Sequence, residues 1–163
     1  EALANWFYVN ATHMLDLGFH LGGEPDAFDA TAIGEVSWHK PAAFSGQGVT
    51  QNGALFTWHA DWRAPGRWGL DLRTSKRRLV LQPLEELSEQ GVSGFGLKAV
   101  AIDDEADKRF KPGLFRQTQA FLSGTPEASA LLPLAAQAAR LRMLEAIRTG
   151  EAFRRAPRKA MSA

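Results

Sequence analysis

Between residues 28 and 82 the hydrophobic and polar side chains alternate with a period of two, which is typical of strands with one buried face. In the clearest run, every second residue from Phe56 to Trp62 is apolar and the residues between are polar. The predicted strands cover residues 28–38, 56–62, 67–73, 78–82 and 97–102. Strands joined by turns this short pair antiparallel. Residues 41–53 are expected to form a loop, because glycines and the dipeptide Asn52-Gly53 favour turns.

Helical signals occur at both ends of the chain. The first predicted helix follows a strand-like run at residues 6–9, begins near Thr12 and stops at Gly22-Gly23. Its apolar face is expected to hold Met14, Leu17, Gly18 and Leu21, and its opposite face His13, Asp16 and His20. Two more helices are predicted at residues 113–122 and 133–148. Residues 103–107, which connect the last predicted strand to these helices, are expected to form an acidic loop. The last helix carries an apolar stripe of Leu134, Ala138, Leu141 and Leu144.

These elements predict an α+β fold with a largely antiparallel, open β-sheet and with helices packed on one face. The alternation places Trp58, Trp62 and Trp68 on one face of the sheet and Asp61, Arg63 and Asp71 on the other. We interpret the tryptophans as core or subunit-interface residues, with a sugar-stacking platform as the alternative. The mixed-charge face contacts either water or a second subunit. We expect the chain to form a dimer through this face of the sheet.

Composition narrows the class of protein without naming a function. A chain of 163 residues with 45% hydrophobic and 23% charged residues is the size of one globular domain. A net charge of +1 gives no reason to expect a nucleic acid or a membrane as partner, and no apolar run is long enough to span a bilayer. The absence of cysteine fits a cytoplasmic protein.

His13 is the residue whose chemistry attracts attention first. On the first turn of a helix that begins where a strand ends, an imidazole would lie at the edge of a cleft, where the helix dipole disfavours its cationic form. Such a ring can accept a proton from a substrate. The plainer interpretation is a surface or partly buried histidine. A metal site built from His13, Asp16 and His20 is a third possibility, but no third ligand joins the i, i+4 pair of Asp16 and His20, so no metal is expected.

The order of these motifs resembles the C-terminal domain of the Gfo/Idh/MocA oxidoreductases, the family of glucose–fructose oxidoreductase and inositol dehydrogenase. Members carry an Asp-x-x-x-His-x-x-Asp pattern followed by a helix that ends in Gly-x-Pro. His13 and Asp16 match the last two positions of that pattern, and residues 21–25 match the ending. Residues 121–124, 132–133 and 145–147 are similar to the closing segment of the family. The resemblance covers about residues 6–153, and the basic residues 154–163 are expected to form a disordered tail.

Two features depart from the family pattern. Val9 stands where the family has its leading aspartate, so that role is either absent or passed to a neighbour such as Asn10. The nucleotide-binding half that precedes this domain in the family, with its glycine-rich turn and Glu-Lys-Pro lysine, does not occur in the 163 residues. His39-Lys40-Pro41 is similar to that lysine motif but follows His13, and we interpret it as a strand end leading into a proline turn.

The resemblance implies the substrate-side domain of an NAD- or NADP-dependent oxidoreductase that acts on a sugar, polyol or related hydroxy compound. Oxidation of an alcohol needs a base for the hydroxyl proton while hydride leaves for the nicotinamide, and His13 is the expected base. Tyr8, Asn10 and Asp16 are the expected substrate-binding residues. Without its nucleotide-binding half, the chain alone is expected to bind no cofactor and to turn over no substrate. The alternative is a binding or assembly domain that keeps the fold without catalysis.

Overall fold

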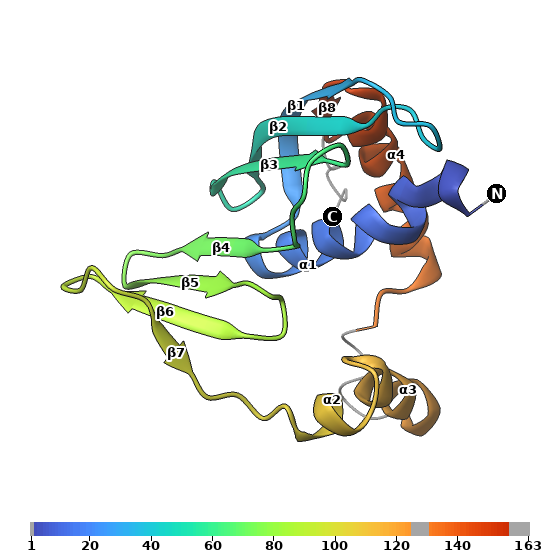
Figure 1. The fold of residues 1–163 in the computed structure, drawn as a ribbon. Coiled ribbons are helices and arrows are strands. Elements are labelled where there is room, and N and C mark those ends of the chain that lie inside the picture. The colour runs from blue at the N-terminus through green and yellow to red at the C-terminus, as the bar shows by residue number, and fades with distance from the viewer. Residues whose placement is uncertain (1, 125–130, 157–163) are drawn as a thin grey trace, which may run out of the picture. The chain divides into compact units, whose positions relative to one another are not determined.

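The computed structural model describes residues 2–124 and 131–156 of the chain, and it divides into two compact units. The first unit comprises Glu1–Pro65 and Ala139–Ala163, and the second comprises Gly66–Ala138. Each unit contains helices and one open, four-stranded antiparallel sheet (Figure 1). The predicted α+β class is therefore confirmed, although two sheets take the place of the single one expected.

The sheet of the first unit has the strand order β3-β2-β1-β8. Its strands are β1 (Pro25–Ile33), β2 (Ala43–Thr50), β3 (Leu55–Asp61) and β8 (Phe153–Arg154). All neighbouring strands pair antiparallel, and the register places Phe28 opposite Gly48 and Gly48 opposite Phe56. The expected strand at 56–62 is thus confirmed, whereas the one at 28–38 begins three residues earlier and ends at Ile33.

Strand β2 corrects the expectation of a loop at residues 41–53. The glycines in it are not turn residues: a Cβ on Gly46 would lie 2.2 Å from the Trp58 ring, and one on Gly48 would lie 2.8 Å from the Phe56 ring. Both glycines therefore leave room for aromatic rings on the neighbouring strand. Only the turn at Asn52-Gly53, where Gly53 has φ +83°, agrees with the prediction.

The N-terminal segment is helical throughout, so the predicted strand at residues 6–9 is wrong. A 3₁₀ turn, η1 (Leu3–Asn5), and a π-helical turn, η2 (Phe7–Ala11), lead directly into α1 (Thr12–Gly22). Burial explains the difference, because Phe7 is fully buried and Val9 is 51% exposed although a strand would place both on one face. Gly23, with φ +108°, ends the helix as predicted.

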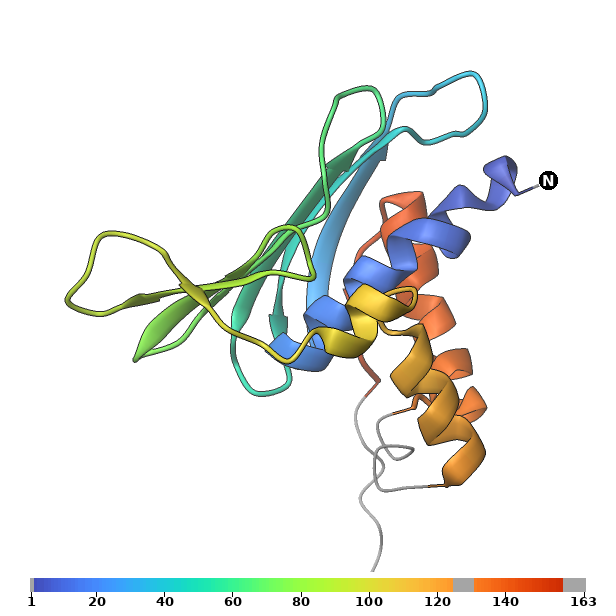
Figure 2. The same cartoon turned by 60° about the horizontal axis from the view of Figure 1, so that its bottom comes forward.

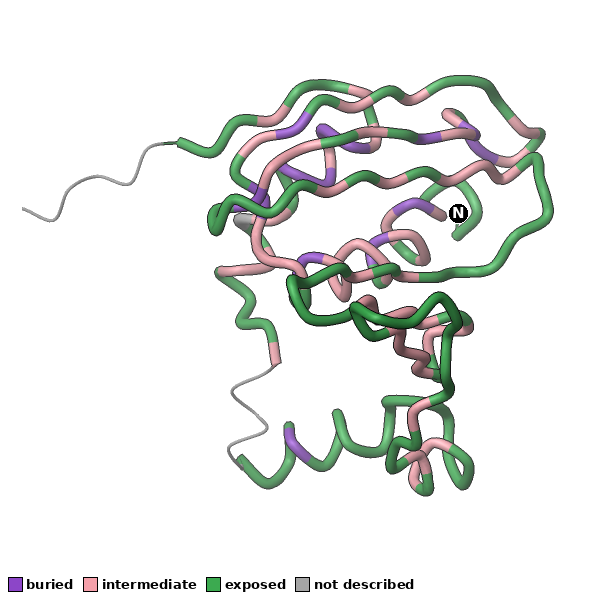
Figure 3. The backbone as a smooth tube through the Cα atoms, turned by 90° about the vertical axis from the view of Figure 1, so that its left-hand side faces the viewer, coloured by how far each residue is buried: buried purple, intermediate pink, exposed green. Residues whose placement is uncertain are grey.

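Helices η2, α1 and the C-terminal part of α4 (Leu134–Thr149) cover one face of the first sheet (Figure 2). The buried core between them consists of Phe7, Phe19, Phe28, Phe44, Met143, Leu144, Ala146 and Ile147. Phe56, Trp58, Ala60 and Trp62 pack against this core, as their alternation predicts. Among the described residues, every buried hydrophobic side chain except Ala120 belongs to the first unit (Figure 3).

Both predicted helix faces need correction. In α1 the buried residues are Thr12 and Phe19, and Leu21 is exposed, because the helical run continues without a break from Phe7 and its core-facing side is set by that ring. In α4 only Leu144 of the expected stripe is buried, whereas Leu134 and Leu141 are exposed. The buried stripe of α4 instead begins at Met143, where the helix meets the first sheet.

The ordered chain extends beyond residue 153, where the domain was expected to end. Arg154 pairs with Ala27 in β8, and the Arg155 backbone N–H donates to the Asp26 carbonyl oxygen at 2.8 Å. Edge pairing to β1 therefore fixes the first residues of the predicted tail. The rest of that expected tail, residues 157–163, lies outside the described residues.

In its described residues the second unit holds a sheet of order β4-β5-β6-β7, two complete helices and the first residues of α4. Its elements are β4 (Leu70–Arg73), β5 (Arg77–Leu81), β6 (Leu87–Gly91), β7 (Lys98–Val100), α2 (Glu105–Arg109) and α3 (Leu114–Ser123). Strand β6 was not predicted because Ser88 and Glu89 interrupt its apolar pattern, and α2 occupies part of the expected acidic loop. Trp68 precedes β4, in a different unit from Trp58 and Trp62, so the prediction of one shared face fails for it. In the described part of the chain no helix is long and apolar enough to cross a membrane.

Candidate functional site

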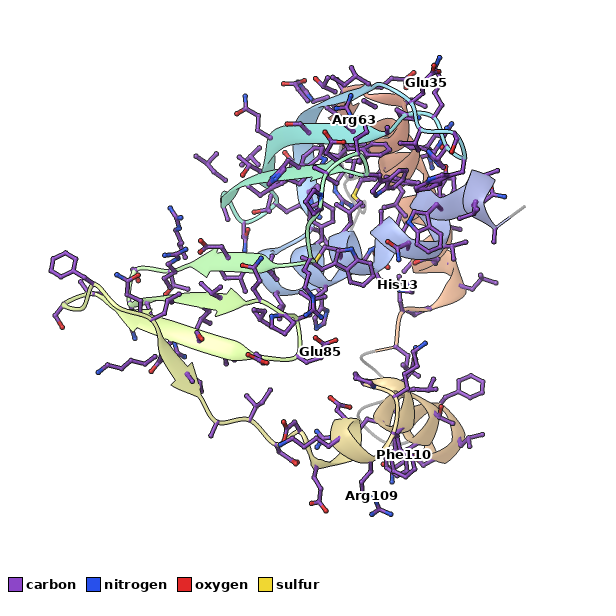
Figure 4. The ribbon with its side chains drawn as sticks, viewed as in Figure 1. His13, Glu35, Arg63, Glu85, Arg109 and Phe110 are labelled. Atoms are coloured by element: carbon purple, nitrogen blue, oxygen red, sulfur yellow. The ribbon has the colours of Figure 1, made fainter. Side chains whose placement is uncertain are left out.

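His13 lies on the outside of helix α1, with its side chain exposed (Figure 4). Its ring makes no hydrogen bond or ion pair with the residues that the structure describes. Because the helical run begins ten residues earlier, at Leu3, His13 does not occupy the first turn. The helix-dipole argument for a neutral ring therefore does not apply. What remains is an accessible imidazole on a helix whose other side is buried.

Tyr8 is joined to helix α4 one turn before His13. Its hydroxyl donates a hydrogen bond to Glu145, which in turn accepts a bond of 2.8 Å from the Arg148 Nε. Burial and the neighbouring Glu145 carboxylate raise the pKa of Tyr8. Hydrogen bonds from Arg148 and from Tyr8 hold the pKa of Glu145 at about 2, and the pKa of Arg148 is raised by Glu145. Near neutral pH Glu145 is therefore a carboxylate and Tyr8 a neutral donor.

Asp16 belongs to a second contact between α1 and α4. The Arg140 guanidinium lies 3.0 Å from the Asp16 Oδ1 and also bonds Glu24, which follows the helix. Arg140 is largely buried, with 13% of its side chain exposed, whereas Asp16 and Glu24 are about one-third exposed. Arg155 lies 3.7 Å from the other Glu24 oxygen. The helix that carries His13 is thus fixed to α4 by charge-assisted bonds at two places.

Asn10 lies between these two contacts and is half-buried. Its side chain has no hydrogen-bond partner among the described residues, and Val9 beside it is exposed to solvent. Val9, which stands where the family has its leading aspartate, therefore does not pack into the core. Asn10 is the polar side chain nearest in sequence that could replace such an aspartate toward a ligand.

The predicted site residues differ in whether their polar groups are already used in hydrogen bonds within the chain. His13 and Asn10 have no partner among the described residues, whereas the Tyr8 hydrogen and the Asp16 Oδ1 are already used in bonds to α4. The Tyr8 oxygen and the Asp16 Oδ2 keep lone pairs that can accept a hydrogen bond. Arg140 and Glu145 could not be predicted as partners of Asp16 and Tyr8, although the i, i+3 spacing of Glu145 and Arg148 does indicate a helical ion pair.

The hollows on the described surface include two shallow ones, and neither of these contains His13. One lies at α2 and α3, beside the stacked rings of Phe110 and Phe115, whose centroids are 4.7 Å apart (Figure 4). The other lies on the face of the first sheet that the helices do not cover, between Asp29, Gln47 and Leu55. No group of three or more His, Cys, Asp or Glu side chains among the described residues could hold a metal ion.

Comparison with known proteins gives a limited likeness. No protein-family model matches the chain, and no curated protein matches it. Among solved structures it is similar to levoglucosan dehydrogenase in three complexes, with NADH, with NADH and levoglucosan, and with NADH and L-sorbose. In each case the sequence identity is 19% and the TM-score 0.49, over 58% of this chain and 30% of the dehydrogenase chain. The function therefore has to be argued from the residues of this chain.

Proposed function

We propose that this chain is the substrate-side domain of an NAD- or NADP-dependent oxidoreductase that acts on a sugar, polyol or related hydroxy compound. The observation that carries the proposal is the exposed His13 imidazole, which has no partner among the described residues and projects from a helix braced by Arg140 and Glu145. The spacing of His13 and Asp16, followed by the stop at Gly22-Gly23, supports it from the sequence.

His13 supplies the proton chemistry in this proposal. A neutral imidazole accepts the proton of a substrate hydroxyl through whichever ring nitrogen faces it, and returns that proton to water afterwards. A base works only when its ring stays within hydrogen-bond reach of that hydroxyl. The bonds of Asp16 and Tyr8 to α4 serve this need, because they fix the helix that carries His13.

Asn10, Tyr8 and Asp16 are proposed as the substrate-binding residues. The Asn10 amide can both donate to and accept from a hydroxyl group. The Tyr8 oxygen and the Asp16 Oδ2 can each accept from a substrate hydroxyl without releasing the bonds that they make to α4. A substrate with several hydroxyl groups suits such a set, because each group is both donor and acceptor.

A nicotinamide cofactor has no fitting site among the described residues. Dinucleotides bind where a glycine-rich turn joins a parallel strand to a helix, with the pyrophosphate at the helix N-terminus. Every strand pair in both described sheets is antiparallel, so this strand–turn–helix unit is not formed by them. In this proposal the cofactor belongs to a nucleotide-binding half carried by a longer polypeptide.

The coding frame upstream of Glu1 tests the proposal directly. We expect it to encode a Gly-x-Gly-x-x-Gly strand–turn–helix followed by a Glu-Lys-Pro segment. The longer polypeptide should then reduce NAD or NADP, followed by absorbance of the reduced nicotinamide, when a sugar or polyol is added. A frame that closes without such a unit would contradict the proposal.

The second candidate is a binding or assembly domain without catalysis. The observation that favours it is that Tyr8 and Asp16 already bond to α4, and that His13 lies in neither of the two hollows at α2–α3 and on the first sheet. A longer polypeptide that binds a sugar but transfers no hydride to either nicotinamide would select this candidate.

A further inference from the structure

The hairpin that joins β6 to β7 exposes three large apolar side chains at its tip. Phe95 is fully exposed, Val92 is 81% exposed and Leu97 is 47% exposed. The tip is an ordered turn, because the Gly94 N–H donates to the Gly91 carbonyl oxygen at 3.1 Å and the Gln90 side chain donates to the Gly94 carbonyl oxygen at 2.7 Å. What distinguishes the tip is that three such side chains occur within six residues of one turn, which makes it a candidate interaction site.

The same end of the second sheet is rich in positive charge. The register places Arg77 opposite Gly91 and Lys98 opposite Glu89, so the first residues of β5 and β7 lie at the base of the tip. Five cations lie in this region, namely Arg73, Lys76, Arg77, Arg78 and Lys98, against two carboxylates, Asp71 and Glu89.

Ion pairs leave this excess unneutralised. Asp71 is shared by Arg73, at 3.2 Å, and Arg78, at 2.7 Å, and Glu89 pairs with Arg77 at 3.3 Å. Lys76 and Lys98 pair with no acidic side chain in the described part of the chain. The apolar tip thus rises from a base with a local excess of three positive charges, which the net charge of +1 for the whole chain conceals.

We propose that the hairpin at residues 91–98 docks on an anionic lipid surface, with Val92, Phe95 and Leu97 entering the headgroup region. Lys76 and Lys98 would then face the lipid phosphates and carboxylates. An apolar group together with a basic patch is the combination that gives reversible attachment to anionic membranes. This attachment is independent of the proposed oxidoreductase function and adds an interfacial partner where the sequence indicated none.

Lipid is favoured over a pocket on another protein because the apolar groups cover a convex, glycine-rich turn. Added Cβ atoms on Gly91 and Gly96 would meet nothing within 4 Å, so the tip is open on all sides. A fluid interface accepts such a shape without a matching cavity. The turn carries backbone groups that need water, so only its side chains enter the interface and the hairpin does not cross the bilayer.

Vesicle flotation of the 163-residue chain tests this proposal. Vesicles of phosphatidylcholine with phosphatidylserine should carry the protein upward, whereas vesicles of phosphatidylcholine alone should not. Phe95→Ala should lower the binding constant about tenfold, because the burial of one aromatic side chain is lost. The pair Lys76→Gln and Lys98→Gln should lower it by about fivefold per charge. Phe121→Ala is the matched control, because Phe121 is also exposed, on α3, but far from the hairpin in sequence.

Depth measurement separates docking by the tip from general adsorption. The chain has no cysteine, so Phe95→Cys and Glu85→Cys each give a single site for a nitroxide label. Glu85 lies in the turn between β5 and β6, at the other end of this sheet (Figure 4). A label at 95 should become inaccessible to a water-soluble relaxation agent on anionic vesicles, and one at 85 should not. The proposal is overturned if the unmodified chain binds neither vesicle, if Phe95→Ala binds as well as the unmodified chain, or if Phe95→Ala instead abolishes pairing of two copies in solution.

Discussion

At the scale of single residues, Arg140 is the side chain that holds helix α1 of the candidate site against α4. It is largely buried and contacts Asp16 on α1 and Glu24 just after it. One guanidinium bonds both carboxylates, and among the described residues only Glu24 has a second cation near it, Arg155 at 3.7 Å. The orientation of the helix that carries His13 therefore depends on this arginine.

Replacing Arg140 with alanine should destabilise the chain. Asp16 and Glu24 would lose their shared cation, and because both are about one-third exposed the cost should be about 1–2 kcal/mol, below that of a fully buried pair. Chemical denaturation measures it. Arg142→Ala is the matched control, since Arg142 is exposed on the same helix and should change the free energy of unfolding by less than about 0.5 kcal/mol. Equal effects of the two variants would contradict this role of Arg140.

The Glu145 carboxylate should make stability depend on pH in acid. Its pKa falls from an ordinary 4.5 to about 2 in the folded chain, so the folded state holds the proton less tightly than the unfolded state. That stabilisation is complete above about pH 4.5 and is lost as the pH falls toward 2. Glu145→Gln should flatten the fall of the unfolding free energy across this window. Part of the slope should remain, because the pKa of Asp61 is also lowered to about 2 by Arg63.

Denaturation at a series of pH values provides the measurement. Glu151→Gln, at an exposed carboxylate without an ion pair among the described residues, is the control and should keep the slope of the unmodified chain. A Glu145→Gln variant with that same slope would show that the bonds from Arg148 and Tyr8 do not hold Glu145 as the structure indicates.

These residue contacts mark the limit of what the sequence could predict. An exposed His13 followed by Asp16 at i+3 can be recognised from helical spacing. The partners of Asp16 and Tyr8 lie 124 and 137 residues further along the chain. Local periodicity holds no information about such distant pairs, so both residues were expected to be free for substrate.

At the scale of elements, glycine in strand β2 is required by the rings on its neighbour. Trp58 and Phe56 lie over Gly46 and Gly48, and Trp58 also meets Phe28 edge to face with ring centroids 5.2 Å apart. The aromatic layer that packs the first sheet against its helices thus depends on glycine at positions 46 and 48, where any side chain would collide with the rings. Glycine favours turns in most sequences, which is why this strand was expected to be a loop.

Gly46→Ala should destabilise the first unit. The added Cβ would lie 2.2 Å from the rigid Trp58 ring and 2.6 Å from the Asp29 carbonyl oxygen, so either the ring or the backbone has to move. Overpacking of this kind costs about 1–3 kcal/mol. Thermal unfolding followed by near-ultraviolet circular dichroism would report both the loss and the displaced tryptophan. Gly66→Ala, where nothing lies within 4 Å, should leave the transition unchanged. A stable Gly46→Ala variant with the original spectrum would refute the packing.

At the N-terminus the local pattern predicted a strand where the structure has a helix. Four consecutive residues, Trp6 to Val9, are of types that favour strands. Tertiary packing overrides that preference, because Phe7 reaches the core from a helix and packs 5.3 Å from Phe44, ring centroid to centroid. The predictions of a helix that begins near Thr12, of its end at Gly22-Gly23 and of the strand at 56–62 (β3) were correct, because their sequence signals were strong and local.

At the scale of the whole molecule, the uncovered face of the first sheet is the surface best suited to a second copy. Five of its exposed residues, Thr31, Ser45, Gln47, Thr57 and His59, lie side by side in the register and are polar. Leu55, which is 88% exposed, adds an apolar side chain to the same face. Flat sheet faces of this kind meet their own copy about a two-fold axis in many homodimers. We expect a dimer through this face.

Light scattering should then return twice the chain mass of 17.8 kDa at high protein concentration. Thr57→Arg, on the edge strand β3 of that face, should shift the mass toward one chain by repulsion between two close arginines across the axis. Ser37→Arg, in an exposed turn, should leave the dimer intact. A mass of one chain for the unmodified protein would exclude the dimer.

The role of His13 is tested most directly by turnover of the longer polypeptide with His13→Ala. We expect kcat to fall by about 10²–10⁴-fold, the contribution of a positioned general base, with a much smaller change in KM for the sugar or polyol. His20→Ala is the matched control, since His20 is exposed on the same helix and should keep nearly full turnover. Near-normal turnover of His13→Ala, or equal losses in the two variants, would contradict the account of His13 as the base.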